Sequence, residues 1–271
     1  GLKYNYRARI CLLQPKKFPQ NQRGMSLSAL PTIIVPARLA SVRFPRKLLA
    51  DAGGKPLILR TAERLREQAP EFEIIFAVDG EELATPLRDG GFESLLTDPN
   101  LPSGTDRIAQ ANQTLGRPTV INVQADEPMV EREHILALAE ALRKEEASMA
   151  TLAVRFHRKE DFLDPDQVKV VMDGNDYALY FSRAPIPHLR DGSGESPDMD
   201  ESAALKHLGM YAYKSSFLKT YAESGQGVLE KIEKLEQLRA LEFGYRIAVS
   251  IVSKATIGVD KPEDLESLSF S

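Results

Sequence analysis

The sequence has little of several residue types that define other classes of protein. It contains one cysteine, Cys11, and no tryptophan among its 271 residues. A single cysteine cannot form an intramolecular disulfide or a cysteine-rich metal site, and it favours a reducing compartment. No apolar run approaches the roughly 20 residues that span a bilayer. These absences predict a cytoplasmic protein without a membrane partner.

The chain also lacks a strong excess of charge of either sign. Its 35 Lys and Arg residues nearly balance 39 Asp and Glu residues. No global basic field is therefore available to attract nucleic acid, and any anion site must be local. The length and the 42% apolar composition suit one large α/β domain.

The first 24 residues differ from the rest, because they include six basic residues and no acidic one. We expect a leader or disordered extension at residues 1–24, followed by one domain at residues 25–271. A targeting peptide is the alternative, although the apolar core of a secretory signal is missing.

From Pro31 onward, short apolar runs alternate with amphipathic stretches, which is typical of βαβ units. This order predicts an α/β fold with a mostly parallel, Rossmann-like sheet. The expected strands are 33–35, 74–78, 94–96 and 120–123, and the expected helices are 58–68, 81–88, 106–115 and 134–144.

Beyond residue 149 the pattern changes to strands joined by short turns, which predicts an inserted antiparallel element at about 149–221. This element has more apolar strand than a surface flap should expose, so we expect a homodimer. Its strands are expected at 151–156, 168–172, 178–181 and 208–213, with a helix at 215–221. One helix at 229–243, a strand at 245–253 and a helix at 262–268 should follow.

A basic loop directly follows the first predicted strand. Its cations are Arg38, Arg43, Arg46 and Lys47, and two prolines stiffen it. Ligands of open α/β sheets bind at the carboxyl ends of the strands, which is where this loop begins. The pattern predicts a phosphate site, and a solvated basic loop is the alternative.

Two carboxylates and one helix start are further candidates. Asp126 follows the strand at 120–123 and could bind Mg²⁺, or could cap the next helix. Asp260 precedes a helix that begins with proline, and from sequence alone a helix cap is the favoured interpretation. The segment 103–107 has small residues that permit close approach of an anion or a base edge, and a plain helix cap is equally compatible.

These residues fall within a wider resemblance. From about Leu30 to Leu268 the chain resembles the 3-deoxy-manno-octulosonate (Kdo) cytidylyltransferases, also called CMP-Kdo synthetases. The matching blocks, in the family's order, are Val35–Arg38, Gly54–Leu57, Ser103–Arg107, Asn122–Pro128, Tyr177–Pro187, His207–Tyr211, Leu235–Arg239 and Gly258–Asp260. The blocks Tyr-Ala-Leu-Tyr-Phe-Ser-Arg and Leu-Glu-Gln-Leu-Arg are the most specific.

The resemblance implies a nucleotide-diphospho-sugar transferase fold and an enzyme that transfers CMP from CTP to the anomeric hydroxyl of Kdo. Pyrophosphate would be released with the help of Mg²⁺, and the product would serve lipopolysaccharide synthesis. By the same resemblance, Ala37, Arg38, Ser41 and Lys47 would hold the triphosphate, Ser103, Gly104, Thr105 and Arg107 would line the cytosine pocket, and Asp126 and Asp260 would bind the metal. Gln124, Arg183, His207, Tyr211, Glu236 and Gln237 would hold the sugar. Arg38, Lys47, Asp126 and Asp260 would be the catalytic residues.

Some positions depart from the family pattern. Ala125 and Arg46 each replace a glycine of the family pattern. Leu48 replaces a proline, Leu39 replaces a tyrosine, and Gly227-Val228 replaces a Ser/Thr-Pro pair. The alternatives are therefore a cytidylyltransferase for a modified Kdo or another keto sugar acid, and a catalytically silent nucleotide-sensing homologue. An NAD-dependent dehydrogenase is disfavoured, because no G-x-G-x-x-G follows the first strand.

Overall fold

The computed structural model describes residues 30–41, 43–188 and 204–268. The described residues form two compact units. The first unit contains residues 30–139, 210–224 and 256–268, and the second contains residues 140–209 and 225–255, apart from the residues that are not described. The predicted extension at residues 1–24 lies outside the described residues.

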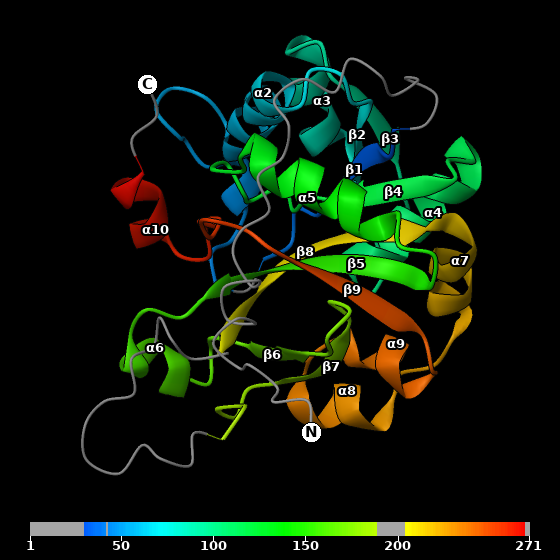
Figure 1. Ribbon diagram of the computed structural model, residues 1–271. Helices are drawn as coiled ribbons and strands as arrows, with labels where there is room; N and C mark the ends of the chain where they lie inside the picture. The colour runs from blue at the N-terminus through cyan, green and yellow to red at the C-terminus, as the bar shows by residue number, and fades with distance from the viewer. Residues whose placement is uncertain (1–29, 42, 189–203, 269–271) are drawn as a thin grey trace, which may run out of the picture. The chain divides into compact units, whose positions relative to one another are not determined.

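The first unit is built on a parallel sheet (Figure 1). The strands lie in the order β3-β2-β1-β4, and neighbouring strands of this set are parallel. The C-terminal part of β8 then pairs antiparallel with β4. The bounds are β1 Thr32–Ala37, β2 Ile74–Val78, β3 Glu93–Leu96, β4 Thr119–Asn122 and β8 Leu205–Lys214. The predicted parallel core is confirmed.

Burial explains why these segments form a central sheet with helices against it. Ile33, Ile34 and Val35 of β1 are all fully buried, as expected for a strand covered on both faces. Helix α2 buries Leu57, Ile58, Thr61, Ala62 and Leu65, which share one face at helical spacing. The helices of this unit are α2 Leu57–Gln68, α3 Glu81–Asp89, α4 Gly104–Leu115, α5 Arg132–Leu142, α7 Ser215–Glu223, α10 Pro262–Ser267 and the short 3₁₀ helix η2 Lys47–Leu49; the last turn of α5 is counted with the second unit.

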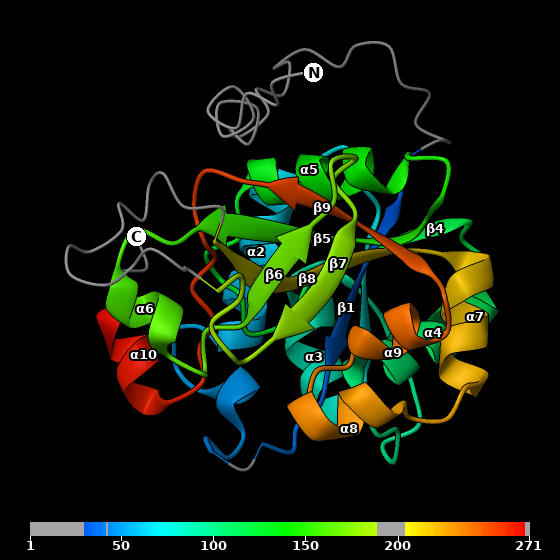
Figure 2. The ribbon, with the colours of Figure 1, turned by 60° about the horizontal axis from the view of Figure 1, so that its bottom comes forward.

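The second unit combines parallel and antiparallel pairs (Figure 2). β5 Ala147–Arg155 pairs in parallel with β9 Arg246–Ile251. β6 Lys169–Met172 and β7 Ala178–Ser182 form an antiparallel hairpin, and β6 also pairs antiparallel with the start of β8. The helices are α6 Lys159–Leu163, α8 Val228–Glu233 and α9 Leu238–Glu242.

Two expectations for this region are wrong. The strand expected at 151–156 was assigned to antiparallel pairing, but β5 pairs in parallel with β9, in addition to its place beside β8. The helix expected at 229–243 is two helices, because Lys234 adopts a left-handed conformation with φ 56° that ends α8. The pattern also missed α6 and η2.

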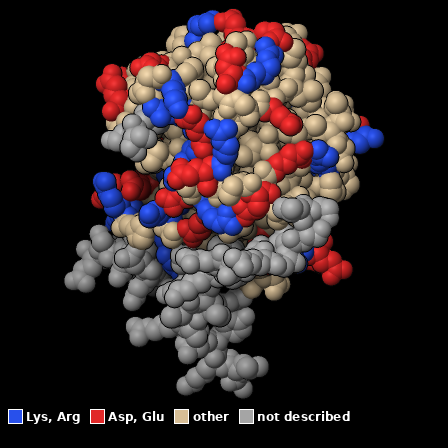
Figure 3. Space-filling view, turned by 90° about the horizontal axis from the view of Figure 1, so that it is seen from above, with Lys and Arg blue, Asp and Glu red and all other residues tan. Residues whose placement is uncertain are grey.

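Charged residues of both signs are interspersed on the face shown in Figure 3. A nucleic-acid-binding surface would present an extended basic field. The described residues of that face form no such field. In the part of the chain that the structure describes, no helix is both long and apolar enough to cross a membrane.

Candidate active site

The basic loop after β1 is fixed near both ends by residues that follow β2. The amide of Leu39 donates a hydrogen bond to Asp79 Oδ2 at 2.8 Å. At the other end, the guanidinium of Arg46 forms an ion pair with Glu82. Sequence analysis missed Asp79, although it follows a buried strand directly, as Asp126 does. The same reasoning about strand ends could have found it.

Arg46 has a backbone conformation that suits glycine. Its φ of 57° and ψ of 26° lie in the left-handed region. A residue with a Cβ adopts this region at a cost of roughly 1–2 kcal/mol, whereas glycine does so readily. The departure from glycine at this position therefore leaves the turn into η2 in place.

Lys47 lies between the two carboxylates that the resemblance assigns to the metal. Its ammonium group donates hydrogen bonds to the Asp126 carboxylate and, at 2.8 Å, to the carbonyl oxygen of Val259. The distance from Lys47 Nζ to Asp260 Oδ1 is 3.7 Å. Arg43 Nη2 lies 2.8 Å from the same oxygen. Two acidic residues that are far apart in the sequence thus approach one ammonium group.

Neither carboxylate caps a helix. Asp264 Oδ2 accepts hydrogen bonds from the amides of Asp260 and Lys261, both at 2.8 Å, so Asp264 provides the side-chain cap of α10. The Asp260 carboxylate instead contacts Arg43. The helix-cap interpretation of Asp260 does not describe the structure, and α5 begins only at Arg132, six residues after Asp126.

Glu127 is an acidic residue of this site that sequence reasoning did not single out. The Thr256 side chain hydrogen-bonds its carboxyl group. Its Oε2 atom is buried and has no hydrogen-bond partner among the described residues. Burial raises the pKa of Glu127 to about 7; the charges of Asp126 and Asp260 act in the same direction, and the Thr256 bond opposes them. Its position beside Asp126 was the available signal.

The N-terminus of α4 approaches the end of β1. Ser103 Oγ accepts a hydrogen bond from the amide of Asp106 at 3.1 Å, which caps the helix. A Cβ atom on Gly104 would lie 3.3 Å from Pro36 Cγ and 3.7 Å from Gln124 Nε2. Gly104 therefore permits a close approach between α4, β1 and Gln124.

The other two predicted residues of this segment are buried. Thr105 is 6% exposed and Arg107 is 2% exposed. The Arg107 guanidinium donates hydrogen bonds to the Thr97 hydroxyl and, at 3.2 Å, to the carbonyl oxygen of Asp98. Arg107 thus holds the segment between β3 and α4, and its role toward cytosine stays a prediction.

The remaining predicted residues of the first unit lie at or near strand ends. Ala37 is buried at the end of β1, Arg38 is exposed and Ser41 is half-buried. Gln124 Nε2 donates to Asn122 Oδ1 at 3.1 Å. Tyr211 lies opposite Asn122 in the pairing of β8 with β4.

The second unit contains the other four predicted sugar-binding residues. Arg183 donates from Nε to the carbonyl oxygen of Glu233 at 2.8 Å and from Nη1 to that of Pro165 at 3.1 Å. Glu236 is exposed, and Gln237 is 3% exposed. Nothing in the structure contradicts their assignment, and it stays a prediction.

His207, the fourth of these residues, is enclosed. Its Nε2 atom lies 2.9 Å from the Thr151 hydroxyl, and its ring packs against the Phe181 ring in a T-shaped arrangement with centroids 4.9 Å apart. Burial lowers the pKa of His207 to about 3. The imidazole is therefore neutral at physiological pH and cannot act there as a proton donor with a charged ring.

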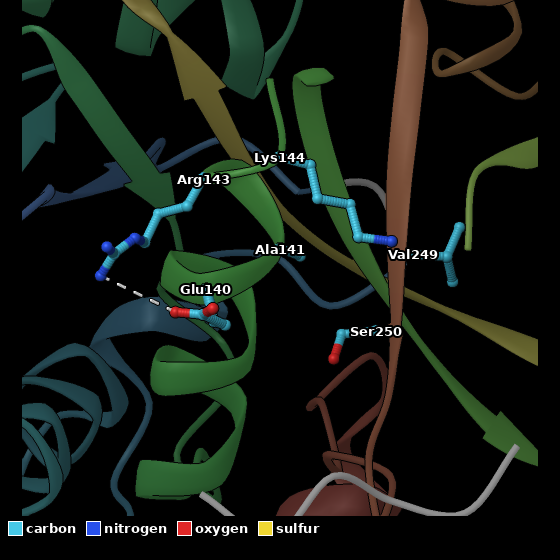
Figure 4. Close-up of a pocket in the computed structure, with 6 residues that line it drawn as sticks. All are labelled: Glu140, Ala141, Arg143, Lys144, Val249 and Ser250. Carbon is cyan, nitrogen blue, oxygen red and sulfur yellow. Dashed lines mark ion pairs between the residues drawn. The ribbon is translucent and has the colours of Figure 1, made fainter. Parts of the chain in front are cut away.

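A cavity of about 290 Å³ in the second unit lies between the C-terminal end of α5 and β9 (Figure 4). Its two cations already have acidic partners: Arg143 lies 3.9 Å from Glu140, and Lys144 lies 2.9 Å from Asp176. None of the predicted site residues lines it; the lining residues are Glu140, Ala141, Arg143, Lys144, Val249 and Ser250.

Comparison with known proteins identifies the family of the chain. A family model described as cytidylyltransferase matches residues 32–247. The 3-deoxy-manno-octulosonate cytidylyltransferase of Syntrophobacter fumaroxidans is 47% identical over 87% of this chain and 94% of its own length, and that of Neisseria meningitidis is 43% identical over 86% and 94%. A solved structure of CMP:2-keto-3-deoxy-manno-octonic acid synthetase complexed with CTP is 34% identical, with a TM-score of 0.80, over 88% of this chain and 95% of that chain.

The chain therefore belongs to the cytidylyltransferase family. Within that family, the relatives named above are those that act on 3-deoxy-manno-octulosonate, as their names state.

Proposed function

We propose that this protein transfers CMP from CTP to the anomeric hydroxyl of Kdo and releases pyrophosphate, as a step of lipopolysaccharide synthesis. The observation that carries the proposal is the meeting of Lys47, Asp126 and Asp260 at the basic loop. Two further observations support it. The matches to the 3-deoxy-manno-octulosonate cytidylyltransferases span most of both chains, and a similar solved structure contains CTP. The single cysteine supports work in a reducing compartment such as the cytoplasm.

Asp126 and Asp260 would hold Mg²⁺. Both carboxylates approach Lys47 Nζ, so their oxygens can reach one cation. Among the described residues no group of three or more His, Cys, Asp or Glu side chains could hold a metal alone. Two carboxylates plus phosphate oxygens and water is the donor set that Mg²⁺ prefers, so the residues fit this ion. When bound, the ion would neutralise phosphate charge and lower the pKa of the sugar hydroxyl.

The protein residues would contribute position and charge. Arg38, Ser41 and Lys47 would bind the triphosphate, and the N-terminus of α4 would supply backbone donors and a partial positive charge for the nucleotide. Transfer of this kind depends on alignment and charge neutralisation more than on a covalent intermediate. No histidine base is required, which is consistent with the neutral state of His207.

By the resemblance, the sugar-binding residues of the second unit are Arg183, His207, Glu236 and Gln237, and those of the first unit are Gln124 and Tyr211. An arginine can bind a carboxylate through two parallel hydrogen bonds, so Arg183 is suited to the acid group of the sugar. His207 would contribute only uncharged contacts.

The test is Asp126→Asn, which removes a charge and keeps the shape of the side chain. We expect pyrophosphate release from CTP and Kdo to fall by on the order of 10³-fold or more, because one of two metal carboxylates is lost. Asp89→Asn makes the same chemical change at an exposed position in α3 and should leave the rate unchanged. Turnover by Asp126→Asn within tenfold of the wild type would refute the metal role.

A screen of CTP and UTP against several keto sugar acids separates the alternatives. Release of pyrophosphate with Kdo and CTP alone supports the proposed reaction. Faster release with a modified Kdo or another keto sugar acid identifies a different substrate, and CTP binding without release with any sugar identifies a nucleotide-sensing homologue.

We also propose that the protein is a homodimer. Several large apolar side chains of the second unit are at least half exposed, including Val228 and Ile232, which lie one turn apart on α8. The others are Leu163, Leu179 and Phe243. Contiguous exposed apolar surface commonly marks protein interfaces, and Val228 and Ile232 provide such a surface on α8. Light scattering at micromolar concentration should give twice the mass of the chain, and a monomer would reject the proposal.

A further inference from the structure

Glu127 supports the segment that leads into Asp260. Its carboxyl group is hydrogen-bonded by the side chain of Thr256. A Cβ atom on Gly258 would lie 3.3 Å from Glu127 Oε1, so the backbone of this segment lies directly against the carboxyl group. Next to it, the amide of Val259 donates to the carbonyl oxygen of Asp126 at 2.9 Å. Residues 126–127 and 256–260 are thereby held together.

The other contacts to this segment come from the basic loop. Lys47 Nζ donates to the Val259 carbonyl oxygen at 2.8 Å, and Arg43 contacts Asp260 at 2.8 Å. Both cations belong to the loop proposed to bind the triphosphate, so phosphate oxygens compete with the segment for them. The contact between Glu127 and Thr256 involves neither cation. It can hold the segment whatever the loop binds.

Glu127 also lowers the stability of the fold, which a residue with a purely structural role would not do. Its Oε2 atom is buried without a hydrogen-bond partner among the described residues. A buried polar atom without a partner lowers the stability of the fold. An apolar side chain of similar size would pack here without that cost.

We infer that Glu127 is a positioning residue, which fixes the Asp260 segment beside Asp126 so that both carboxylates reach one metal ion. The inference rests on the proposed metal role of Asp126 and Asp260. Residues that orient metal ligands typically change metal affinity by 10–100-fold when they are mutated, although they do not touch the ion.

The first experiment needs no metal. Hydrogen exchange of the Val259 amide is measured in the wild type, Glu127→Ala and Glu127→Gln. Exchange should be at least tenfold faster in Glu127→Ala, with the melting temperature unchanged or higher, because a costly buried carboxyl group is gone. Glu127→Gln keeps an acceptor for Thr256 and should exchange like the wild type.

Two glycine variants provide a matched pair. Gly258→Ala places a methyl group against the Glu127 carboxyl group and should also speed exchange at Val259. Gly80→Ala makes the same change where no atom lies within 4 Å of the new Cβ, and it should have no effect. Faster exchange in Glu127→Ala at amides throughout the core, with a lower melting temperature, would overturn the inference in favour of a general stabilising role.

The second experiment measures Mn²⁺ binding by electron paramagnetic resonance, with the metal alone and with CTP. The affinity of Glu127→Ala should be at least tenfold weaker than that of the wild type, and Glu127→Gln should restore most of it. Absence of binding by the wild type would overturn the proposed metal site itself. Binding by the wild type, with unchanged Val259 exchange and unchanged affinity in Glu127→Ala, would overturn only the role of Glu127.

Discussion

His207 should make the protein less stable as the pH falls from 8 to 5. The imidazole is enclosed by the second unit, where it contacts the Thr151 hydroxyl and packs against the Phe181 ring. Burial alone accounts for the lowering of its pKa to about 3. In the unfolded chain the ring is exposed to water, and its pKa should be the usual value near 6.5.

The sign and the size of the effect follow from these two values. Between pH 6.5 and pH 3 the unfolded state binds a proton that the folded state does not, so stability is lost as the pH falls through this window. Because each pKa unit corresponds to about 1.4 kcal/mol, His207 should remove about 2 kcal/mol of stability between pH 8 and pH 5. This figure hardly changes for any folded pKa of His207 below about 4.

The assay is urea unfolding of the wild type and His207→Gln at both pH values. Glutamine has no proton to gain, and it can still hydrogen-bond the Thr151 hydroxyl. Contributions from other titrating groups cancel in the comparison, so the wild type should lose about 2 kcal/mol more than the variant. Equal losses in the two proteins, or a His207 ring that titrates near pH 6.5 in an NMR experiment, would refute the reasoning.

Two further predictions concern the region around α8. Glu242 accepts hydrogen bonds from the amides of Val228 and Leu229 at 2.9 and 3.0 Å, so it caps α8 where Gly227 has no side chain to do so. Glu242→Ala should lower the free energy of unfolding, measured with urea, by about 1 kcal/mol. Gly227→Ser should recover part of that loss, but only in the Glu242→Ala background. When Glu242 is present, a Cβ atom at Gly227 would collide with its Oε2 atom. Arg239→Met should cost about 3–5 kcal/mol, because it leaves the buried Glu230 carboxylate without its partner; an unchanged urea midpoint would contradict this.

The periodicity of the first half of the chain correctly predicted its strands and α-helices, whereas the periodicity at 229–243 did not predict two separate helices. Predicted and observed bounds agree for β2 and differ by one residue at the start of α2, because each of these elements packs one regular pattern against neighbouring elements. At 229–243 the apolar spacing suits a single helix. In a continuous helix, however, Glu230 and Arg239 would be roughly 13 Å apart along the axis, at about 1.5 Å per residue. Their carboxylate and guanidinium instead form two hydrogen bonds of 2.8 and 2.7 Å, which requires the break at Lys234.

The partner of β5 was likewise beyond local reasoning. Its own residues identify a strand, but β9, the strand that pairs with it in parallel, lies about 100 residues later in the sequence. Strand pairing at that separation depends on how the intervening elements fold, and no period in the sequence records it. The β6–β7 hairpin was predictable, because its turn is local and Asp173 accepts hydrogen bonds from the amides of Asn175 and Tyr177.

The sequence by itself determined the order of strands and helices in the parallel core, the basic loop after β1 and the identity of Asp126 and Asp260 as candidates. These depend on composition, on local spacing and on the resemblance to a family. Only the tertiary structure decided that Lys47 lies between the two carboxylates and that Asp264 rather than Asp260 caps α10. It also decided that the carboxyl group of Glu127 lies against the segment that leads into Asp260. Those facts are distances between segments far apart in the chain, and they exist only once the sheet has brought its strand ends together.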